Sequence, residues 1–229
     1  MCGRFALTAD PELIQQFFNL QTMPPVMTAR YNIAPTQPVA VIANDVPSEL
    51  TFFRWGLVPS WSKDISIGTK MINARAETLH EKPSFKAAYK RRRCLIPANG
   101  FYEWSKTDDG KKPMYIHLKD HELFAFAGLW ETWHSPDGGE LRTCTIITAE
   151  PNELVKPLHH RMAVILDPSD YDLWLSGDEL PPQALAPLLK PYDADKMGVY
   201  EVSTLVNNAA NDTSELIKPF NSPTQGMMF

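Results

Sequence analysis

The sequence predicts an α+β fold, a single domain with a curved, mostly antiparallel β-sheet or barrel-like core and helices packed outside it. Short runs of branched and aromatic residues recur through the middle of the chain, and turn-forming residues separate most of them. Apolar residues at helical spacing appear only near the start and in three later segments. Proline accounts for 20 of the 229 residues and glycine for only 11, a balance typical of rigid turns between short strands.

The first predicted element is a short helix that opens at Asp10 with proline at its first position. Its apolar face carries Leu13, Ile14, Phe17 and Phe18. A proline-rich connector follows, and from Pro38 the pattern becomes β. Strands are predicted at 39–43, 50–55, 94–104, 114–118, 123–133, 143–148 and 162–166, with turns at 107–112 and 135–140. Helical spacing returns at 84–92, 169–175 and 183–189.

Length and composition fit one domain that spans residues 1–229. Hydrophobic residues make up 44% and charged residues 21%, which excludes a disordered or fibrous chain. The 22 basic and 27 acidic side chains give a net charge of −5, so the chain is no general polycation and any contact with nucleic acid must be local. No internal repeat is visible.

The chain also lacks the signals of membrane insertion and of disulfide or metal staples. Its longest clean apolar run, 123–130, has 8 residues, whereas a spanning helix needs about 20. The N-terminus has no signal-peptide pattern, so we expect a cytoplasmic protein without a membrane partner. The cysteines are three, Cys2, Cys94 and Cys144, and none has zinc-ligand spacing. We therefore expect no disulfide, no metal and no cofactor.

Cys2 is the first candidate for chemistry. Removal of Met1, which is common before a small residue, exposes an amine and a thiol that can act on one carbon. The reference pKa of an α-amine is about 7.7 to 8.0, so part of it is nucleophilic at neutral pH. An aldehyde would form an imine with the amine, and the thiol would then close a five-membered thiazolidine. Retention of Met1 would block this chemistry, and the alternative is a cysteine without a role.

Three further segments carry polar side chains that call for an explanation. In Asn73-Ala74-Arg75-Ala76-Glu77, a strand would place the polar residues on one face; the alternative is a solvent-facing edge strand. Glu103 lies among aromatic residues, which raise a carboxyl pKa and suit it to proton transfer; the alternative is an ion pair with an arginine. His159-His160-Arg161 offers imidazoles and a guanidinium, although a histidine is more often structural.

Residues 82–93 carry six positive and no negative side chains. If 84–93 is helical, Lys86, Lys90 and Arg93 share one face. That face would follow a phosphate backbone or would simply be solvated.

Six motifs follow one another along the chain: Met1-Cys2-Gly3-Arg4-Phe5, Asn32-Ile33-Ala34-Pro35, Trp55-Gly56-Leu57-Val58-Pro59-Ser60-Trp61, Asn73-Ala74-Arg75-Ala76-Glu77, the segment 94–104 and His159-His160-Arg161-Met162. They occur in the order in which the SRAP family (SOS response-associated peptidase; abasic-site processing proteins) carries them. The chain closely resembles that family from residue 1 to about 166, and the stretch 206–217 extends the match.

The resemblance implies a monomeric DNA-damage sensor of the SOS response that binds abasic sites in single-stranded DNA. Cys2 would crosslink to the ring-opened deoxyribose as a thiazolidine. Asn73 would hydrogen-bond at the crosslink, Glu103 would move protons during ring opening and closure, and His159 would assist opening and reversal. His160 occupies the family's variable position. The protein would lie in the cytoplasm, and on the nucleoid when bound to DNA.

The same resemblance directs attention to DNA contacts. A flipped-out sugar lies between two phosphates, so cations are needed near the reactive carbon, and the candidates are Arg4, Arg75 and Arg161. Trp104, Trp61 and Pro35 would stack on or wedge against bases, the alternative for each tryptophan being a place in the core.

Other functions remain open. An activated Cys2 would cleave the Met1-Cys2 bond as an autopeptidase, and an imine that stalls would give weak lyase activity. Met-Cys-Gly also opens amidohydrolases, in which the thiol attacks a side-chain amide. A noncatalytic single-strand binding module would bind DNA and give no covalent product.

Overall fold

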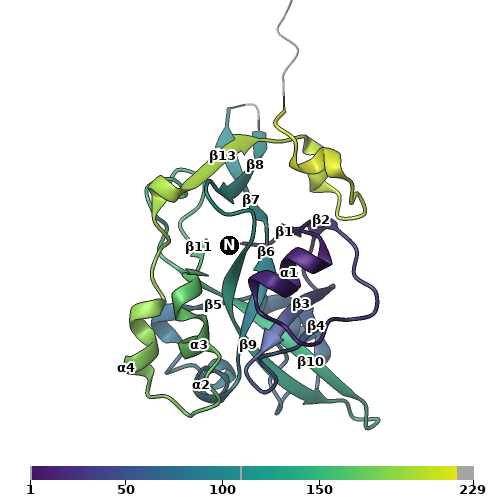
Figure 1. Cartoon of the computed structure of the whole chain (residues 1–229), viewed down its shortest axis with the longest axis vertical. Helices are drawn as coiled ribbons and strands as arrows, with labels where there is room; N and C mark the ends of the chain where they lie inside the picture. Colours follow the sequence, from purple (N-terminus) through teal and green to yellow (C-terminus); the bar gives the residue numbers. More distant parts are fainter. Residues whose placement is uncertain (1, 109, 221–229) are drawn as a thin grey trace, which may run out of the picture.

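The core of the molecule is a closed barrel of five strands (Figure 1). The computed structural model describes residues 2–108 and 110–220. The barrel strands are β3 (Pro38–Ala43), β4 (Leu50–Trp55), β6 (Arg93–Ala98), β9 (Phe124–His134) and β10 (Glu140–Ala149). Neighbours pair antiparallel except β4 and β10, which run parallel, and the β9–β10 pairing closes the ring.

Three short strands extend the barrel at β9 and β10. They are β5 (Asn73–Arg75), which pairs with β10 in parallel, and β11 (Met162–Ala163) and β12 (Ile165–Leu166), which pair antiparallel with β10 and β9. Thr148 of β10 pairs with Arg75 of β5 and with Ala163 of β11, so these two short strands flank the end of β10 on its two edges.

A second, open sheet stands next to the barrel. Its order is β13 (Met197–Glu201), β8 (Gly110–Leu118), β7 (Gly100–Thr107), β1 (Phe5–Leu7) and β2 (Arg30–Ile33), and every pair is antiparallel. Only Asn99 separates β6 from β7, so one chain segment passes from the barrel into the open sheet. The Asn99 side chain accepts hydrogen bonds from the amides of Thr8 and Ala9, which ties the start of the chain to this bend.

Short helices cover the barrel from outside. They are α1 (Pro11–Phe17), α2 (Pro83–Arg91), α3 (Tyr171–Trp174) and α4 (Pro182–Leu185) (Figure 1). Arg93, fully buried, donates to the carbonyls of Trp174 and Ser176, which joins the end of α2 to the segment around α3. The expectation that Arg93 shares an exposed basic face with Lys86 and Lys90 is therefore wrong, because the helix ends at Arg91 and Arg93 begins β6.

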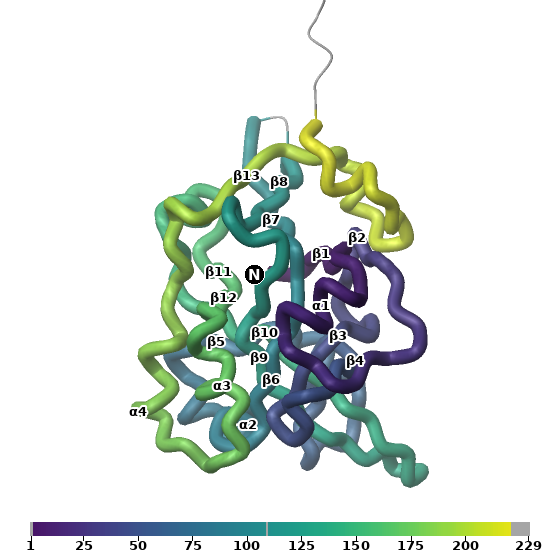
Figure 2. Tube along the Cα trace, in the orientation of Figure 1, coloured from purple at the N-terminus to yellow at the C-terminus, as the bar shows by residue number. Residues whose placement is uncertain are grey.

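A segment near the start of the described chain and one near its end lie side by side, as Figure 2 shows for β2 and residues 206–212. The Asn32 side chain donates to the carbonyls of Val206, Asn208 and Asn211 at 3.2, 3.1 and 2.7 Å. Asp212 in turn accepts from the backbone amides of Tyr31 and Asn32. These bonds fasten residues 206–212 across the edge of the open sheet.

The apolar core has two parts, and β1 belongs to both. Phe5 packs edge-to-face against Trp55 and Phe126 in the barrel, while Ala6 faces a smaller cluster that includes Tyr102. Alternate residues of a strand point to opposite faces, so a strand of three residues joins the two parts.

The predicted fold class is confirmed: one mixed domain contains a closed barrel, an open antiparallel sheet and few helices. Within 2–108 and 110–220, no helix is long and apolar enough to cross a membrane. The predicted single domain also included residues 1 and 221–229, which lie outside the described residues.

Candidate functional site

Cys2 lies immediately before β1 and is fully buried. The side-chain amide of Asn73 donates to the Cys2 carbonyl at 2.9 Å, so β5 fixes the position of this residue. Burial raises the pKa of the Cys2 thiol far above its ordinary value, and the charge of Glu103 raises it further. The thiol is therefore neutral in this environment, and its use as a nucleophile requires a group that accepts its proton.

The side-chain nitrogen of Asn73 forms a hydrogen bond, whereas its side-chain oxygen forms none within the described residues. β5 pairs in parallel with β10, with Asn73 opposite Ile146. Its Nδ2 is bonded to Cys2, while its Oδ1 is buried and has no hydrogen-bond partner among the described residues. A buried acceptor without a donor is costly, so this oxygen suits a hydroxyl or amine brought in by a ligand.

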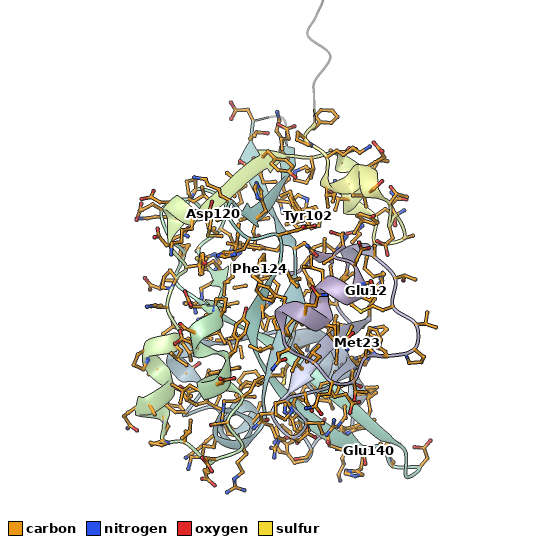
Figure 3. All side chains as sticks on the ribbon, viewed as in Figure 1. Glu12, Met23, Tyr102, Asp120, Phe124 and Glu140 are labelled. Atoms are coloured by element: carbon orange, nitrogen blue, oxygen red, sulfur yellow. The ribbon has the colours of Figure 1, made fainter. Side chains whose placement is uncertain are left out.

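Glu103 is a buried carboxyl on β7. It is 4% exposed, stands opposite Met114 on β8, and follows the buried Tyr102, which Figure 3 labels. Burial, the largest cause, raises the pKa of Glu103 from 4.5 to about 7. A carboxyl with a pKa close to neutral pH both takes up and gives back a proton, as a general acid and base must.

His159 lies in the loop between β10 and β11, and its backbone amide donates to Val155. Its Nδ1 is 3.0 Å from the amide nitrogen of Arg161 and 3.1 Å from the carbonyl oxygen of the same residue. The neutral ring accepts from that N–H and the protonated ring donates to that oxygen, so the ring keeps its place when it changes charge. Burial lowers the pKa of His159. His160 packs against it with ring centroids 4.3 Å apart.

One cavity joins Glu103 and His159. It measures about 550 Å³, and Trp104, His160 and the three lysines Lys106, Lys111 and Lys156 also line it. Because the Glu103 charge also acts on the Cys2 thiol, all four predicted reactive residues belong to this region of the molecule. Met1, whose removal the chemistry of Cys2 requires, lies outside the described residues.

The three predicted phosphate ligands have different surroundings. Arg161 is buried and forms a bidentate ion pair with Glu77 at 2.9 and 2.8 Å. It also donates a hydrogen bond to the Thr148 carbonyl at 2.6 Å. Arg4 donates to Asn32 and to the Val206 carbonyl. Arg75, at the end of β5, has an exposed side chain. A phosphate would have direct access to Arg75, whereas at Arg161 it would compete with Glu77.

The three predicted stacking residues are also separated. Trp104 is half-buried, lines the cavity, and donates from its indole nitrogen to Asn207 at 2.7 Å. Trp61 is 60% exposed in the loop after β4, and Pro35 is half-buried in the turn before β3. Neither Trp61 nor Pro35 lines this cavity.

Sequence reasoning did not identify the lysines of the cavity. Lys106 and Lys111 flank the tip of the β7–β8 hairpin, and Lys156 belongs to the loop that carries His159. The hairpin register would have revealed the first two, because it places them directly opposite each other.

Comparison with known proteins gives consistent matches. Residues 1–209 match the family model described as SOS response associated peptidase (SRAP). Abasic site processing protein YoqW of Bacillus subtilis (strain 168) is 50% identical over 95% of this chain and 99% of its own length. Abasic site processing protein HMCES of Gallus gallus is 36% identical over 72% of this chain and 56% of its own. A crystal structure of a Bacteroides thetaiotaomicron protein superposes with a TM-score of 0.87 at 28% identity, covering 96% of this chain and 100% of that one.

Proposed function

Because this chain belongs to the SOS response associated peptidase (SRAP) family, we propose that it processes abasic sites in DNA by capturing them covalently. The substrate is single-stranded DNA that contains an abasic deoxyribose. The reactive residue is Cys2 with a free α-amine, after removal of Met1. The product is a thiazolidine that joins the protein to C1′ of the sugar and shields the lesion.

The reaction balances with the loss of one water. Ring opening of the hemiacetal moves a proton from the anomeric hydroxyl to the ring oxygen and exposes the C1′ aldehyde. The Cys2 amine adds to that carbon, and loss of water gives an imine. The thiol then adds to the same carbon, forming the C–S bond, while its proton goes to the imine nitrogen. The cavity therefore needs groups that take and return protons.

Glu103 and His159 fit the proton-transfer steps. The pKa of about 7 at Glu103 lets its carboxylate take a proton from the anomeric hydroxyl or the thiol and return it at neutral pH. His159 keeps its place in both protonation states through Arg161, which suits it to protonate the ring oxygen and to deprotonate the corresponding hydroxyl during reversal.

The contact between Asn73 and Cys2 is the observation that carries the proposal. The amide holds the Cys2 carbonyl at 2.9 Å, which orients the residue whose amine and thiol must meet one carbon. Its buried Oδ1 supplies an acceptor for the sugar or for the amine. A cysteine with only a packing role gains nothing from this acceptor, or from the carboxyl of Glu103 near its thiol.

DNA is held by local charges, since the protein as a whole carries −5. Arg75 contacts a phosphate next to the lesion, and Arg4 and Arg161 support the same region. Trp104 offers a ring to a base at the rim of the cavity, and the exposed Trp61 offers another to the strand beyond it. Single strands are preferred because the sugar must leave the stack to reach a buried cysteine.

The test is to mix the protein with a single-stranded oligonucleotide that carries one abasic site. We expect an adduct that survives denaturation and whose mass equals the protein without Met1 plus the oligonucleotide minus one water. The same oligonucleotide reduced with borohydride has no aldehyde and is the matched control, which should give no adduct. A duplex with the same site should react more slowly. Noncovalent binding without an adduct would contradict the proposal and would leave a binding module.

A further inference from the structure

The β7–β8 hairpin carries two positive charges directly opposite each other. Lys106 and Lys111 are register partners, so their side chains leave the same face of the hairpin, and both line the cavity that contains Glu103 and His159. Like charges at directly opposite positions destabilise a strand pair. The placement therefore has an energetic cost in the free protein.

No carboxylate within the described chain forms an ion pair with Lys106 or Lys111. The adjacent Lys112 differs, because it pairs with Glu201 at 3.3 Å across the sheet. Lys156, on the loop that forms another wall of the cavity, has Glu153 at 3.5 Å, with both side chains largely exposed. The hairpin thus directs two ammonium groups toward the cavity without an ion pair within the described residues, in a protein whose net charge is −5.

We propose that Lys106 and Lys111 form a binding site for a phosphodiester of the DNA strand whose abasic sugar enters the cavity. This inference rests on the proposed function. A phosphate between the two ammonium groups removes their repulsion and releases counterions from the DNA. The site is separate from Arg4, Arg75 and Arg161, none of which lines this cavity.

Trp104 supports a nucleic acid rather than another anion. It precedes Lys106 by two residues, so it leaves the same face of β7, and it also lines the cavity. The hydrogen bond from its indole nitrogen to Asn207 restricts the ring. A phosphate site next to a fixed aromatic ring matches the two parts of a nucleotide, the backbone charge and the base face.

The experiment measures noncovalent binding of the full chain to a single-stranded oligonucleotide with a tetrahydrofuran abasic analogue, which has no aldehyde. The variant Lys106→Ala/Lys111→Ala is compared with Lys112→Ala/Lys119→Ala. The control removes equal charge from one position on β8 and one just after its end, neither of which lines the cavity. For single strands, each lost contact lowers the slope of log K against log salt by about 0.7 and the affinity by about fivefold at 0.1 M salt.

We therefore expect about 25-fold weaker binding at 0.1 M salt for the cavity variant, a slope smaller by about 1.4, and convergence with wild type near 1 M salt. The control variant should keep wild-type affinity to within about twofold, as for a surface charge that does not touch the strand. Equal affinity and slope in the two variants would overturn the inference.

Two further arms separate the sources of failure. Inorganic phosphate, added at constant ionic strength, should not displace the oligonucleotide at millimolar concentration; full displacement would mean a site for free phosphate and would overturn the inference. Adduct formation with a true abasic site at saturating DNA tests the proposed function independently. If the wild-type protein forms no adduct, the proposed function is contradicted. If the wild-type protein forms the adduct and the cavity variant binds DNA as tightly as wild type, only the lysine site is contradicted.

Discussion

The barrel and the seam between the barrel and the open sheet, which we define by Cys2, Glu103 and His159, use the same residue types in different ways. Cys94 and Cys144 lie on barrel strands and are as fully buried as Cys2. Burial raises the pKa of all three thiols. Only Cys2 combines a carbonyl held by Asn73 with a carboxyl whose charge acts on its thiol. Burial therefore does not distinguish Cys2, which we propose as the reactive cysteine, from the other two, whereas its contact with Asn73 and the charge of Glu103 do.

Two glutamates show the same contrast. Glu131 on β9 and Glu103 on β7 are 7% and 4% exposed, and burial raises the pKa of both. Glu131 forms an ion pair with Arg92 at 2.7 Å, which offsets part of its desolvation. Glu103 instead lines the cavity together with His159. The barrel carboxyl is thus held in an ion pair with an arginine, whereas the carboxyl on β7 lines a cavity.

The largest expected effect is a difference in adduct formation between substitutions of Cys2 and of Cys144. Cys2→Ala should abolish the stable adduct, because no sulfur remains to close the ring and only a reversible imine can form. Cys144→Ala should keep the adduct and lower stability by about 1 kcal/mol through a small cavity. Intact mass after reaction with abasic DNA measures both, and Cys2→Ser should behave like Cys2→Ala. A thiazolidine-mass adduct in Cys2→Ala would remove the basis of the comparison.

The second effect is a difference in the rate of adduct formation between substitutions of Glu103 and of Glu131. Glu103→Gln should slow adduct formation by about 10²- to 10⁴-fold, the usual cost of losing a positioned acid or base, with DNA affinity within a few-fold of wild type. Glu131→Gln should lower stability by breaking the pair with Arg92 and leave the rate constant nearly unchanged. Single-turnover time courses beside binding titrations measure this. Equal slowing by the two substitutions would mean that Glu103 acts only through folding.

Glu103 should also leave a signature in stability against pH. Its folded pKa of about 7 exceeds the ordinary 4.5, so the folded state holds the proton more tightly. The contribution of Glu103 to the free energy of unfolding is therefore fully present below about pH 4.5 and is lost as the pH rises to about 7, by at most roughly 3 kcal/mol. Thermal melts of Glu103→Gln should show higher stability than wild type at pH 8 and little difference at pH 4. A variant less stable at pH 8 would contradict the raised pKa.

The sequence predicts the long strands well because their own residues carry the signal. Strand 50–55 is found with the predicted bounds, and the predicted strand 94–104 is interrupted only at Asn99. The strands β1, β2 and β13 were not predicted. They have three to five residues, and pairing with partners distant in sequence stabilises them, which no local pattern encodes.

The sequence predicts the candidate site as a set of residues and not as an arrangement. Cys2, Asn73, Glu103 and His159 come from four separate segments, and each alone has an ordinary structural interpretation. Only the order of the SRAP motifs along the chain indicates that these four residues belong to one candidate site. Of Asn73-Ala74-Arg75-Ala76-Glu77, only the first three residues form a strand, so the expectation of one polar face fails at Glu77, which lies in a short 3-10 turn. The ion pair between Glu77 and Arg161 was not visible from the sequence.

The third effect concerns the two adjacent histidines. His159→Ala should slow both formation and reversal of the adduct, because it removes the ring that Arg161 holds in the cavity. His160→Ala should be milder, since that exposed ring contacts His159 mainly by packing. Variants that stall before ring closure should also show weak strand cleavage by β-elimination. If His160→Ala is slow and His159→Ala matches wild type, the roles of the two rings are reversed.

The smallest expected effect separates two arginines that the motifs present as equivalent. Arg75 is exposed, so Arg75→Ala should weaken DNA binding about fivefold at 0.1 M salt, lower the salt slope by about 0.7 and leave the melting temperature unchanged. Arg161→Ala should weaken binding as well, but it also removes the partner of Glu77 and the donor to the buried Thr148 carbonyl. An unsatisfied buried acceptor costs about 1 to 3 kcal/mol, so the melting temperature of Arg161→Ala should fall.

Glu77→Gln is the matched control for Arg161→Ala, because it weakens the ion pair and keeps the cation. If Glu77→Gln strengthens DNA binding while Arg161→Ala weakens it, Glu77 and a DNA phosphate compete for Arg161. If neither arginine variant changes the salt slope, neither arginine contacts a phosphate and the DNA strand binds elsewhere on the protein.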